Sequence, residues 1–344
     1  MTPSTELTER PAAVPAVAAP GRRFDLARYR DLSLLPVLLV LGVIGFAVSP
    51  AFLTSDNLLG VGQQATELSL LVLAQALILI AGRMDLSLES TIGVAPVIAV
   101  WLVLPDHGDR FNGLGLFPGW AAIPLCLAVG VLIGAVNGFL ILKLRLNGFI
   151  VTLGALTLLR GLQVAISEGR SIVNLPGSFR YLGSASWLGA PAAIWICALF
   201  FLVGGAALAW LRQGRALYAI GGNAEAARAA GIRVDRITWA VLILGSVLAA
   251  FAGILYTGHY GSISADQGSG WIFQVFAATV IGGVSLNGGR GTLFGALTGV
   301  LTLQLVVNVM TLAGVPPLWN QFLNGAIIIL ALIVSRFASG EKQE

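Results

Sequence analysis

Several apolar stretches of 18 or more residues follow one another along this chain, and they constrain its fold more than any other feature. A helix of that length crosses the hydrocarbon core of a bilayer with all of its backbone hydrogen bonds made internally. Charged residues make up only 10% of the chain, whereas a soluble domain carries about 25%. The sequence therefore predicts an all-α polytopic membrane protein.

Hydropathy places about ten transmembrane helices in the chain. The predicted spans are 32–50, 62–82, 87–104, 119–142, 148–167, 191–211, 237–257, 271–288, 293–314 and 318–335. The predicted domains are a disordered, basic tail over 1–31, a transmembrane domain over 32–338 and a second tail over 339–344.

The distribution of Lys and Arg orients these spans, because cytoplasmic segments carry an excess of both residues. With the N-terminus inside, 16 of the 20 basic residues lie in inner segments and three lie in outer loops. The remaining one, Arg160, lies within a span. Both termini are therefore predicted to be cytoplasmic.

The longest charged break in the chain lies at 211–237, between the sixth and seventh spans. It contains a short predicted helix over 223–231, with Asn223 as its N-cap and Gly231 as the left-handed residue that ends it. Glu225 and Arg228 suit the two ends of the helix dipole. So short a helix is marginal in water, and nothing apolar in the loop offers a core. It either docks on a partner or is a solvated connector.

Two glycine patterns lie 161 residues apart, and both predict close packing of helices in lipid. One lies in the fourth predicted span and the other in the ninth, and these spans run in opposite directions. The matching spacing indicates an inverted repeat, which is common in transporters; chance spacing among the 43 glycines of the chain is the alternative. The residues are Gly130, Gly134 and Gly138, and Gly291, Gly295 and Gly299.

Polar side chains within the spans are candidates for a translocation path. A set of neutral donors and acceptors suits a sugar-like solute, although each residue alone also suits a hydrogen bond between helices. Arg160 is the most informative, because a charge at this depth usually faces protein or water. The candidates are Gln75, Asn137, Thr157, Arg160, Gln163, Thr279, Gln304 and Asn308.

Other classes of protein fit poorly. A P-loop needs Gly-Lys-Ser/Thr, but Lys143 follows Leu and Lys342 follows Glu. Cys126 and Cys197 lie within apolar runs, so we expect no metal site and no cofactor. Basic residues are spread over the loops, which gives no indication of a nucleic-acid partner. An ion-coupled transporter needs buried ionisable groups or ion sites at broken helices, and an intramembrane enzyme needs a catalytic pair; we expect none of these here.

Four ordered blocks resemble the permease subunits of bacterial ABC importers of the ribose, galactose, arabinose and xylose type. They are GRMDLSLES at 82–90, NGFIVTLGALTLLRG at 147–161, IGGNAEAARAAGIRV at 220–234 and FAATVIGGVSLNGGRGTLFGALTG at 276–299. The resemblance covers about 32–338. It implies a multi-pass protein of the bacterial inner membrane that performs no enzymatic chemistry itself and imports a pentose or a hexose.

The resemblance also implies partners: one or two ABC ATPase subunits, a periplasmic or lipoprotein solute-binding protein, and a second permease subunit, identical or not. It assigns ATPase coupling to the loop 212–236. The coupling residues are Gly222, Asn223, Glu225, Ala226, Ala227, Arg228 and Gly231. A polyol, an autoinducer sugar or a nucleoside is the alternative solute.

The chain departs from the family pattern at two places. Glu89 stands where the family has Gly, and Arg83 and Met84 replace Gly-Ile before Asp85. Before the late glycine-rich block, Ile272 and Gln274 replace two acidic residues of the family's Tyr-Glu-Leu-Asp-Ala-Ile. These departures bear on the solute and leave the coupling segment unchanged.

Overall fold

The computed structural model describes residues 34–106 and 111–316, together with 319, 322, 325, 326 and 329. Both predicted tails, 1–31 and 339–344, and most of the predicted span 318–335 lie outside the described residues.

The described residues are mostly helical, with one two-stranded antiparallel sheet. The α-helices are α2 (Leu35–Val48), α3 (Ser55–Ile80), α4 (Leu88–Val103), α5 (Ala122–Gly138), α6 (Gly148–Ser167), α7 (Gly177–Ser184), α8 (Ala192–Trp210), α9 (Arg212–Gly222), α10 (Ala224–Ala229), α11 (Val234–Tyr260), α12 (Trp271–Ile281) and α13 (Leu293–Leu312). Short helical turns are η1 (Pro50–Leu53), η3 (Gly119–Ala121) and η4 (Phe139–Lys143), and the strands are β1 (Ser186–Trp187) and β2 (Ala190–Pro191).

Within the described residues, six stretches are long and apolar enough to cross a membrane: α3, α5 with its flanking turns, α6, α8, α11 and α13. Three predicted spans correspond to shorter apolar helices, α2, α4 and α12. The span predicted over 271–288 differs most, because α12 has only 11 residues and ends at Ile281. Gly283, Gly288 and Gly289 have positive φ angles, which suit a turn rather than a helix. The loop 282–292 therefore separates α12 from α13.

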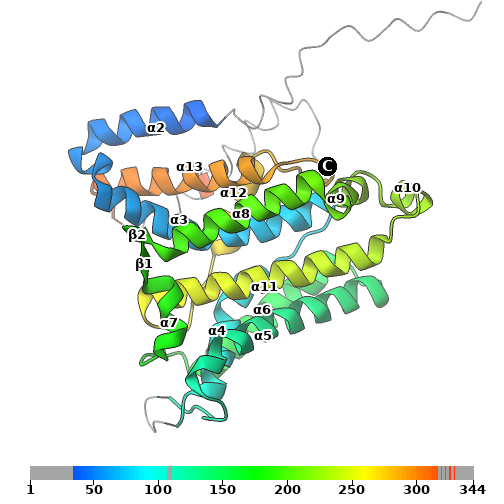
Figure 1. Cartoon of the computed structure of the whole chain (residues 1–344), viewed down its shortest axis with the longest axis horizontal. Coiled ribbons are helices and arrows are strands. Elements are labelled where there is room, and N and C mark those ends of the chain that lie inside the picture. The colour runs from blue at the N-terminus through cyan, green and yellow to red at the C-terminus, as the bar shows by residue number, and fades with distance from the viewer. Residues whose placement is uncertain are drawn as a thin grey trace, which may run out of the picture.

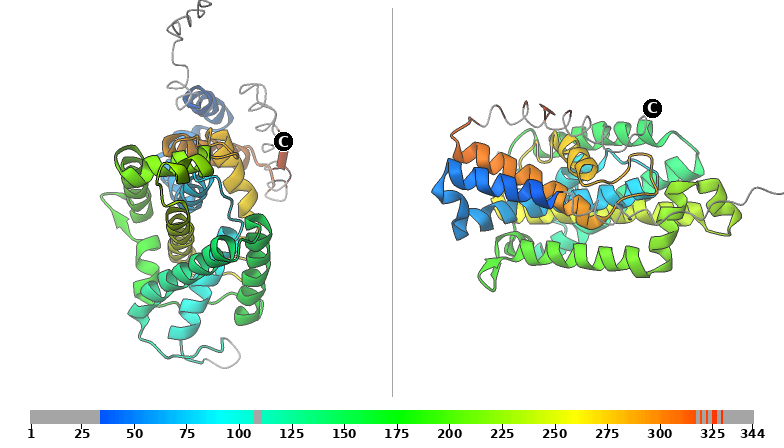
Figure 2. Two further views of the ribbon diagram at one scale, coloured as in Figure 1. Left: turned by 90° about the vertical axis from the view of Figure 1, so that its right-hand side faces the viewer. Right: turned by 90° about the horizontal axis from the view of Figure 1, so that it is seen from above.

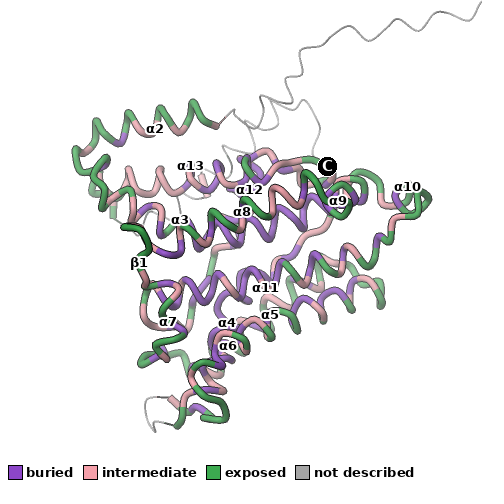
Figure 3. The backbone as a smooth tube through the Cα atoms, viewed as in Figure 1, coloured by how far each residue is buried: buried purple, intermediate pink, exposed green. Residues whose placement is uncertain are grey.

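The long helices run roughly side by side, with α3 and α11 at the centre (Figure 1). α11 packs against α3, α4 and α5, while α3 also contacts α8, α12 and α13. In the apolar window of α3, 94% of the residues are buried, against 17% in α6. Purple segments of the tube mark this difference (Figure 3). α3 is therefore the core of the molecule and α6 is peripheral.

The connections gather at two opposite ends of the bundle. α9 and α10 lie at one end, shown at the right of Figure 1, and α7 lies with β1 and β2 at the other. The end with α9 and α10 is the predicted cytoplasmic end, because it carries the 211–237 segment.

The two glycine patterns make close contacts with different partners. A Cβ at Gly134 of α5 would lie 2.5 Å from Cα of Ile243 in α11, and one at Gly295 of α13 would clash with O of Gly282. Gly291 lies outside α13 with φ of +134°, so its assignment to a helix interface is wrong. The inverted repeat stays a prediction. Gly130 and Gly299 also lie against main-chain atoms, whereas a Cβ at Gly138 would clash with the side chain of Trp239.

Candidate functional site

The first candidate site is the segment 212–236, which carries a short helix with a complete N-cap. Asn223 has extended backbone, and its Oδ1 accepts hydrogen bonds from N of Glu225 at 3.0 Å and N of Ala226 at 2.9 Å. Gly231 has φ of +81°, the left-handed conformation expected where the helix ends. α10 covers 224–229, so it is shorter than the predicted 223–231.

This segment has an apolar core of its own, contrary to the sequence prediction. Ile220, Ala227 and Val234 are buried together, and Ala227 is only 4% exposed. The core forms because α9, α10 and the start of α11 pack together, and each of them supplies one of these three side chains. Ala227 therefore faces the inside of the segment, and its assignment to a partner surface is wrong.

The exposed face of α10 is small and mixed in charge. Glu225, Ala226 and Arg228 are exposed on it, and so are Gly222 and Gly231 at its two sides. Arg228 pairs with Asp235 across 2.8 Å, which ties α10 to the start of α11. Both partners of this pair are more than half exposed, so it contributes little to stability. The face is held in place mainly by the buried core and the cap.

The second candidate site is a polar cluster built around Arg160 of α6. Nη2 of Arg160 lies 3.3 Å from Oε1 of Glu89 in α4, and Nη1 donates to Oε1 of Gln163 at 3.0 Å and to O of Gln267 at 2.7 Å. The other oxygen of Glu89 accepts from N of Ile272 at 3.1 Å. The exposed fraction is 19% for the Arg160 side chain and 8% for Glu89. The cluster is thus a charge-compensated group that joins α4, α6 and the start of α12.

Gln163 and Gln267 fasten the chain segment 261–270 to this cluster. The side-chain amide of Gln163 donates to O of Ser264 at 3.3 Å, and that of Gln267 donates to O of Ile92 at 2.8 Å. A Cβ at Gly93 of α4 would clash with the side chain of Gln163. The absence of a side chain at this position lets α6 approach α4.

The two departures from the family pattern meet in space. The carboxylate of Glu89 accepts a hydrogen bond from the backbone N of Ile272, so the two positions at which the sequence departs from the pattern it resembles are in direct contact. The carboxylate beside residue 272 comes from α4. Sequence reasoning missed Glu89 and Gln267 as cluster members; the pairing of the two departures was the available signal for Glu89, and there was none for Gln267.

Among the other path candidates, Gln75, Asn137 and Thr157 lie apart from this cluster. Gln75 is fully buried in α3, and its side-chain amide has no hydrogen-bond partner among the described residues. Asn137 donates to Oγ of Ser87, which donates in turn to Asp85. Burial raises the pKa of Asp85, and the hydrogen bonds from Ser87 oppose the rise. Thr157 is exposed on α6 and donates to its own helix, three residues before Arg160.

Thr279, Gln304 and Asn308 are also outside the cluster. Thr279 is buried and donates to O of Val275 within α12. Gln304 donates to O of Gln64, and Asn308 exchanges two hydrogen bonds with Asn57, so both link α13 to α3. Of the eight predicted candidates, the structure brings together only Arg160 and Gln163.

A buried carboxylate that the sequence analysis missed lies within α3. The side chain of Glu67 is 3% exposed, and its Oε1 lies 2.9 Å from Nδ1 of His259 on α11. Together with Glu89, it shows that the expectation of no buried ionisable groups is wrong. Each of these carboxylates has a side-chain partner, Arg160 for Glu89 and His259 for Glu67, and a partner reduces the cost of burying a polar group.

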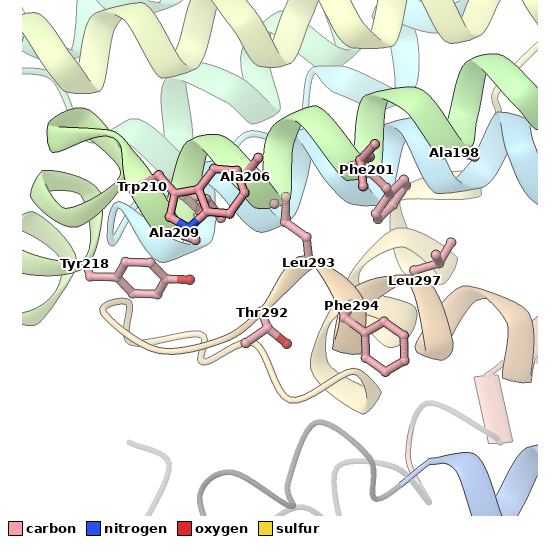
Figure 4. Close-up of a pocket in the computed structure, with 13 residues that line it drawn as sticks. Ala198, Phe201, Ala206, Ala209, Trp210, Tyr218, Thr292, Leu293, Phe294 and Leu297 are labelled. Atoms are coloured by element: carbon pink, nitrogen blue, oxygen red, sulfur yellow. The ribbon is translucent and has the colours of Figure 1, made fainter.

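A large groove of about 670 Å³ lies between α8, α9 and the start of α13 (Figure 4). Phe201, Trp210, Leu293 and Phe294 are among its lining residues, and the ring of Tyr218 lies at one end. A sugar needs hydrogen-bond partners, whereas this lining is almost entirely apolar. The groove therefore suits lipid chains better than a path for a sugar.

Comparisons with known proteins give a consistent match over most of the chain. Residues 57–332 match the family described as Branched-chain amino acid transport system / permease component. The chain is 33% identical to the ribose import permease protein RbsC of Escherichia coli over 319 residues, which cover 91% of this chain and 96% of the relative. No solved structure matches it.

Two further relatives carry other names. Identity to the autoinducer 2 import system permease protein LsrC of Klebsiella pneumoniae is 34% over 309 residues, covering 90% of this chain and 87% of the relative. Identity to the L-arabinose transport system permease protein AraH of Escherichia coli is 33% over 326 residues, covering 94% and 96%.

Proposed function

The chain belongs to the family of branched-chain amino acid transport system permease components, among its sugar ABC importer permeases, and we propose that it carries a pentose or a hexose into the cytoplasm. It is a multi-pass protein of the bacterial inner membrane. The proposed partners are ABC ATPase subunits, an extracytoplasmic solute-binding protein and a second permease subunit. The binding protein delivers the solute, and ATP binding and hydrolysis in the ATPase drive alternating access.

The exposed face of α10 carries this proposal. It is a preformed helix at one end of the bundle, with a side-chain cap and a small buried core, and its exposed alanines leave room for close contact. A solvated connector needs neither a cap nor a core. The ordered face therefore supports docking of the ATPase rather than a simple connection between α9 and α11.

The polar cluster at Arg160 supports a neutral, hydroxyl-rich solute. The charges of Arg160 and Glu89 compensate each other, so that the cluster offers an ion little electrostatic binding energy. The same pair offers both donors and acceptors of hydrogen bonds to the hydroxyl groups of a solute. Thr157 lies one helical turn before Arg160 and is exposed. We place the solute path along this side of α6. The alternative is another small polar solute, because one relative is named for the import of autoinducer 2.

Uptake into proteoliposomes tests the function. The protein is reconstituted with its ATPase and binding protein, and a panel of labelled pentoses, hexoses, polyols and nucleosides is supplied. We expect uptake of one sugar that requires hydrolysable ATP on the ATPase side and survives ionophores. Uptake without ATP that collapses when ion gradients are dissipated would instead establish an ion-coupled transporter.

A further inference from the structure

An apolar crevice of about 330 Å³ lies between the second half of α8, α9 and the start of α11. Leucine, isoleucine, valine, alanine and glycine residues of these helices form its walls, together with Leu77 of the core helix α3. Among the lining residues, only Gln213 and Arg236 have polar side chains. An apolar cavity stays dry and accepts an apolar ligand, so this crevice suits a hydrocarbon group.

The crevice opens on a side of the bundle that faces lipid. α8 and α11 are both long and apolar enough to cross the membrane. Three residues that line the crevice from these helices and their ends, Leu211, Ala240 and Leu244, are exposed. In a membrane protein, exposed apolar side chains on spanning helices lie against the acyl chains of the bilayer. Lipid therefore has direct access to the crevice.

The two polar residues of the crevice lie where the spanning helices end. Trp210, the last residue of α8, is 79% exposed, and tryptophan gathers at the boundary between hydrocarbon and headgroups. Gln213 is the second residue of α9, and Arg236 is the third residue of α11, directly before its apolar part. The left view of Figure 2 faces this end of the bundle, which carries α9 and α10. Gln213 and Arg236 are thus at the level of the lipid headgroups.

The guanidinium of Arg236 is available to a ligand. Its side chain is exposed, and nothing in the described part of the chain forms a hydrogen bond or an ion pair with it. The carboxylate next to it in sequence, that of Asp235, pairs instead with Arg228 at 2.8 Å. A guanidinium binds phosphate oxygens through two parallel hydrogen bonds, and the side-chain amide of Gln213 adds a further donor. A phosphate group therefore finds an uncompensated positive charge at this crevice.

The larger groove on α8, lined by Phe201 and Trp210 among others, provides a contrast within the same protein. It is also apolar, but none of its lining residues is charged. It accepts acyl chains without a preference for their headgroup. The crevice at Arg236 instead combines an apolar space with a cation, which is the combination that selects anionic lipids between spanning helices.

We propose that this crevice binds an anionic phospholipid, with an acyl chain between α8 and α11 and the phosphate at Arg236 and Gln213. A zwitterionic lipid carries a cationic group beside its phosphate, so its net attraction to Arg236 is weaker. The bound lipid fills the space between α8, α9 and α11 and stabilises their packing. The inference depends on the location of the chain in a membrane and is independent of its solute and of the ATPase.

Native mass spectrometry tests the headgroup preference. The whole protein is mixed with equal amounts of phosphatidylglycerol and phosphatidylcholine that have the same acyl chains, and the lipid retained at high collision energy is identified. We expect at least five times more phosphatidylglycerol than phosphatidylcholine on the unmodified protein, and a ratio near one for Arg236→Gln. Arg145→Gln is the matched control, because it removes an exposed arginine from the turn between α5 and α6, away from the crevice. This control is expected to keep the preference.

Ala240→Trp tests the apolar part of the site, because it fills the crevice from an exposed position on α11. We expect it to lose the retained phosphatidylglycerol, whereas Leu132→Trp, at an exposed position on α5, keeps it. Thermal unfolding checks that each variant is folded, and added phosphatidylglycerol is expected to raise the unfolding temperature only of the proteins that retain it.

Two results overturn the proposal at Arg236: equal retention of both lipids by the unmodified protein, or the same lipid ratio for Arg236→Gln and Arg145→Gln. Retention of phosphatidylglycerol by Ala240→Trp at the level of Leu132→Trp overturns the proposal as well. That comparison decides the question if Arg236→Gln does not fold.

Discussion

Glu89 supplies the negative charge of the polar cluster, and its removal leaves Arg160 without a counter-ion. Breaking a fully buried ion pair from one side costs about 3–5 kcal/mol. Because 19% of the Arg160 side chain is exposed, we expect Glu89→Gln to cost less than that range but to lower the unfolding temperature clearly. Thermal unfolding in detergent measures the change. An unchanged unfolding temperature would mean that the pair contributes nothing to stability.

The double variant Glu89→Leu with Arg160→Met separates stability from transport. Replacing both members of a buried pair by apolar side chains is often neutral or stabilising. We therefore expect the unfolding temperature to return to near that of the unmodified protein, while sugar uptake stays at least tenfold below normal. Normal uptake by the stable double variant would show that the pair only holds the helices together.

Ala227 is the residue whose role changed most between the sequence and the structure. It is buried against Ile220 and Val234, so an arginine at this position must either displace these two side chains or unfold the segment. We expect Ala227→Arg to expose the segment 212–236 to proteolysis, whereas Ala226→Arg is expected to leave it resistant. Limited proteolysis followed by mass spectrometry compares the two. Equal resistance of both variants would contradict the buried core.

Local chemistry explains which residues the sequence predicted correctly. The roles of Asn223 and Gly231 depend on backbone geometry within a few residues, which propensity rules describe. The burial of Ala227 depends on α9 folding back beside it, and the role of Glu89 depends on Arg160, 71 residues away. Such contacts arise from tertiary packing, which no local pattern encodes.

At the scale of the helices, the glycine contacts on α5 and α13 give a direct test. A leucine at Gly134 or Gly295 places bulk against the main chain of a neighbouring segment, so we expect a large loss of folded protein from each. Gly154→Leu on α6 is the control, because a Cβ there meets no atom within 4 Å. Size-exclusion chromatography in detergent measures the yield. A normal yield from either Gly134→Leu or Gly295→Leu would contradict close packing at that position.

The long apolar helices were predictable because a bilayer imposes their length and composition. α12 was extended too far, because the glycine-rich residues after Ile281 continue an apolar run although their φ angles turn the chain. α9 was missed because it is neither apolar nor long, and it gains its stability by packing on α8 and α10. The sequence predicted the helices that are surrounded by lipid, whereas the helices that it missed are stabilised by packing against other helices.

At the scale of the whole molecule, the orientation in the membrane is open to measurement. Single cysteines are placed at Ser178 in α7 and at Ala229 in α10, both exposed, in a variant whose buried Cys126 and Cys197 are replaced by alanine. An impermeant thiol reagent added to intact cells is expected to label position 178 and to leave position 229 unlabelled. Labelling of position 229 from outside would reverse the predicted topology.

The predicted translocation path also shows the limit of sequence at this scale. The eight polar residues share a hydropathy environment, yet they separate in space into the Arg160 cluster, the α3–α13 hydrogen bonds and several isolated positions. Depth in the membrane is readable from the sequence because it follows from position within a span. Which face of each helix meets which neighbour is decided by packing.

The affinity of the ATPase for Ala226→Arg tests the account most directly. The variant adds a long charged side chain to the exposed face of α10 and leaves its cap and its buried core in place. We predict at least a tenfold loss of affinity, about 1.4 kcal/mol, with normal thermal stability and with Leu144→Arg as an unaffected control. An affinity equal to that of the unmodified protein would contradict the proposal that the ATPase docks on this face.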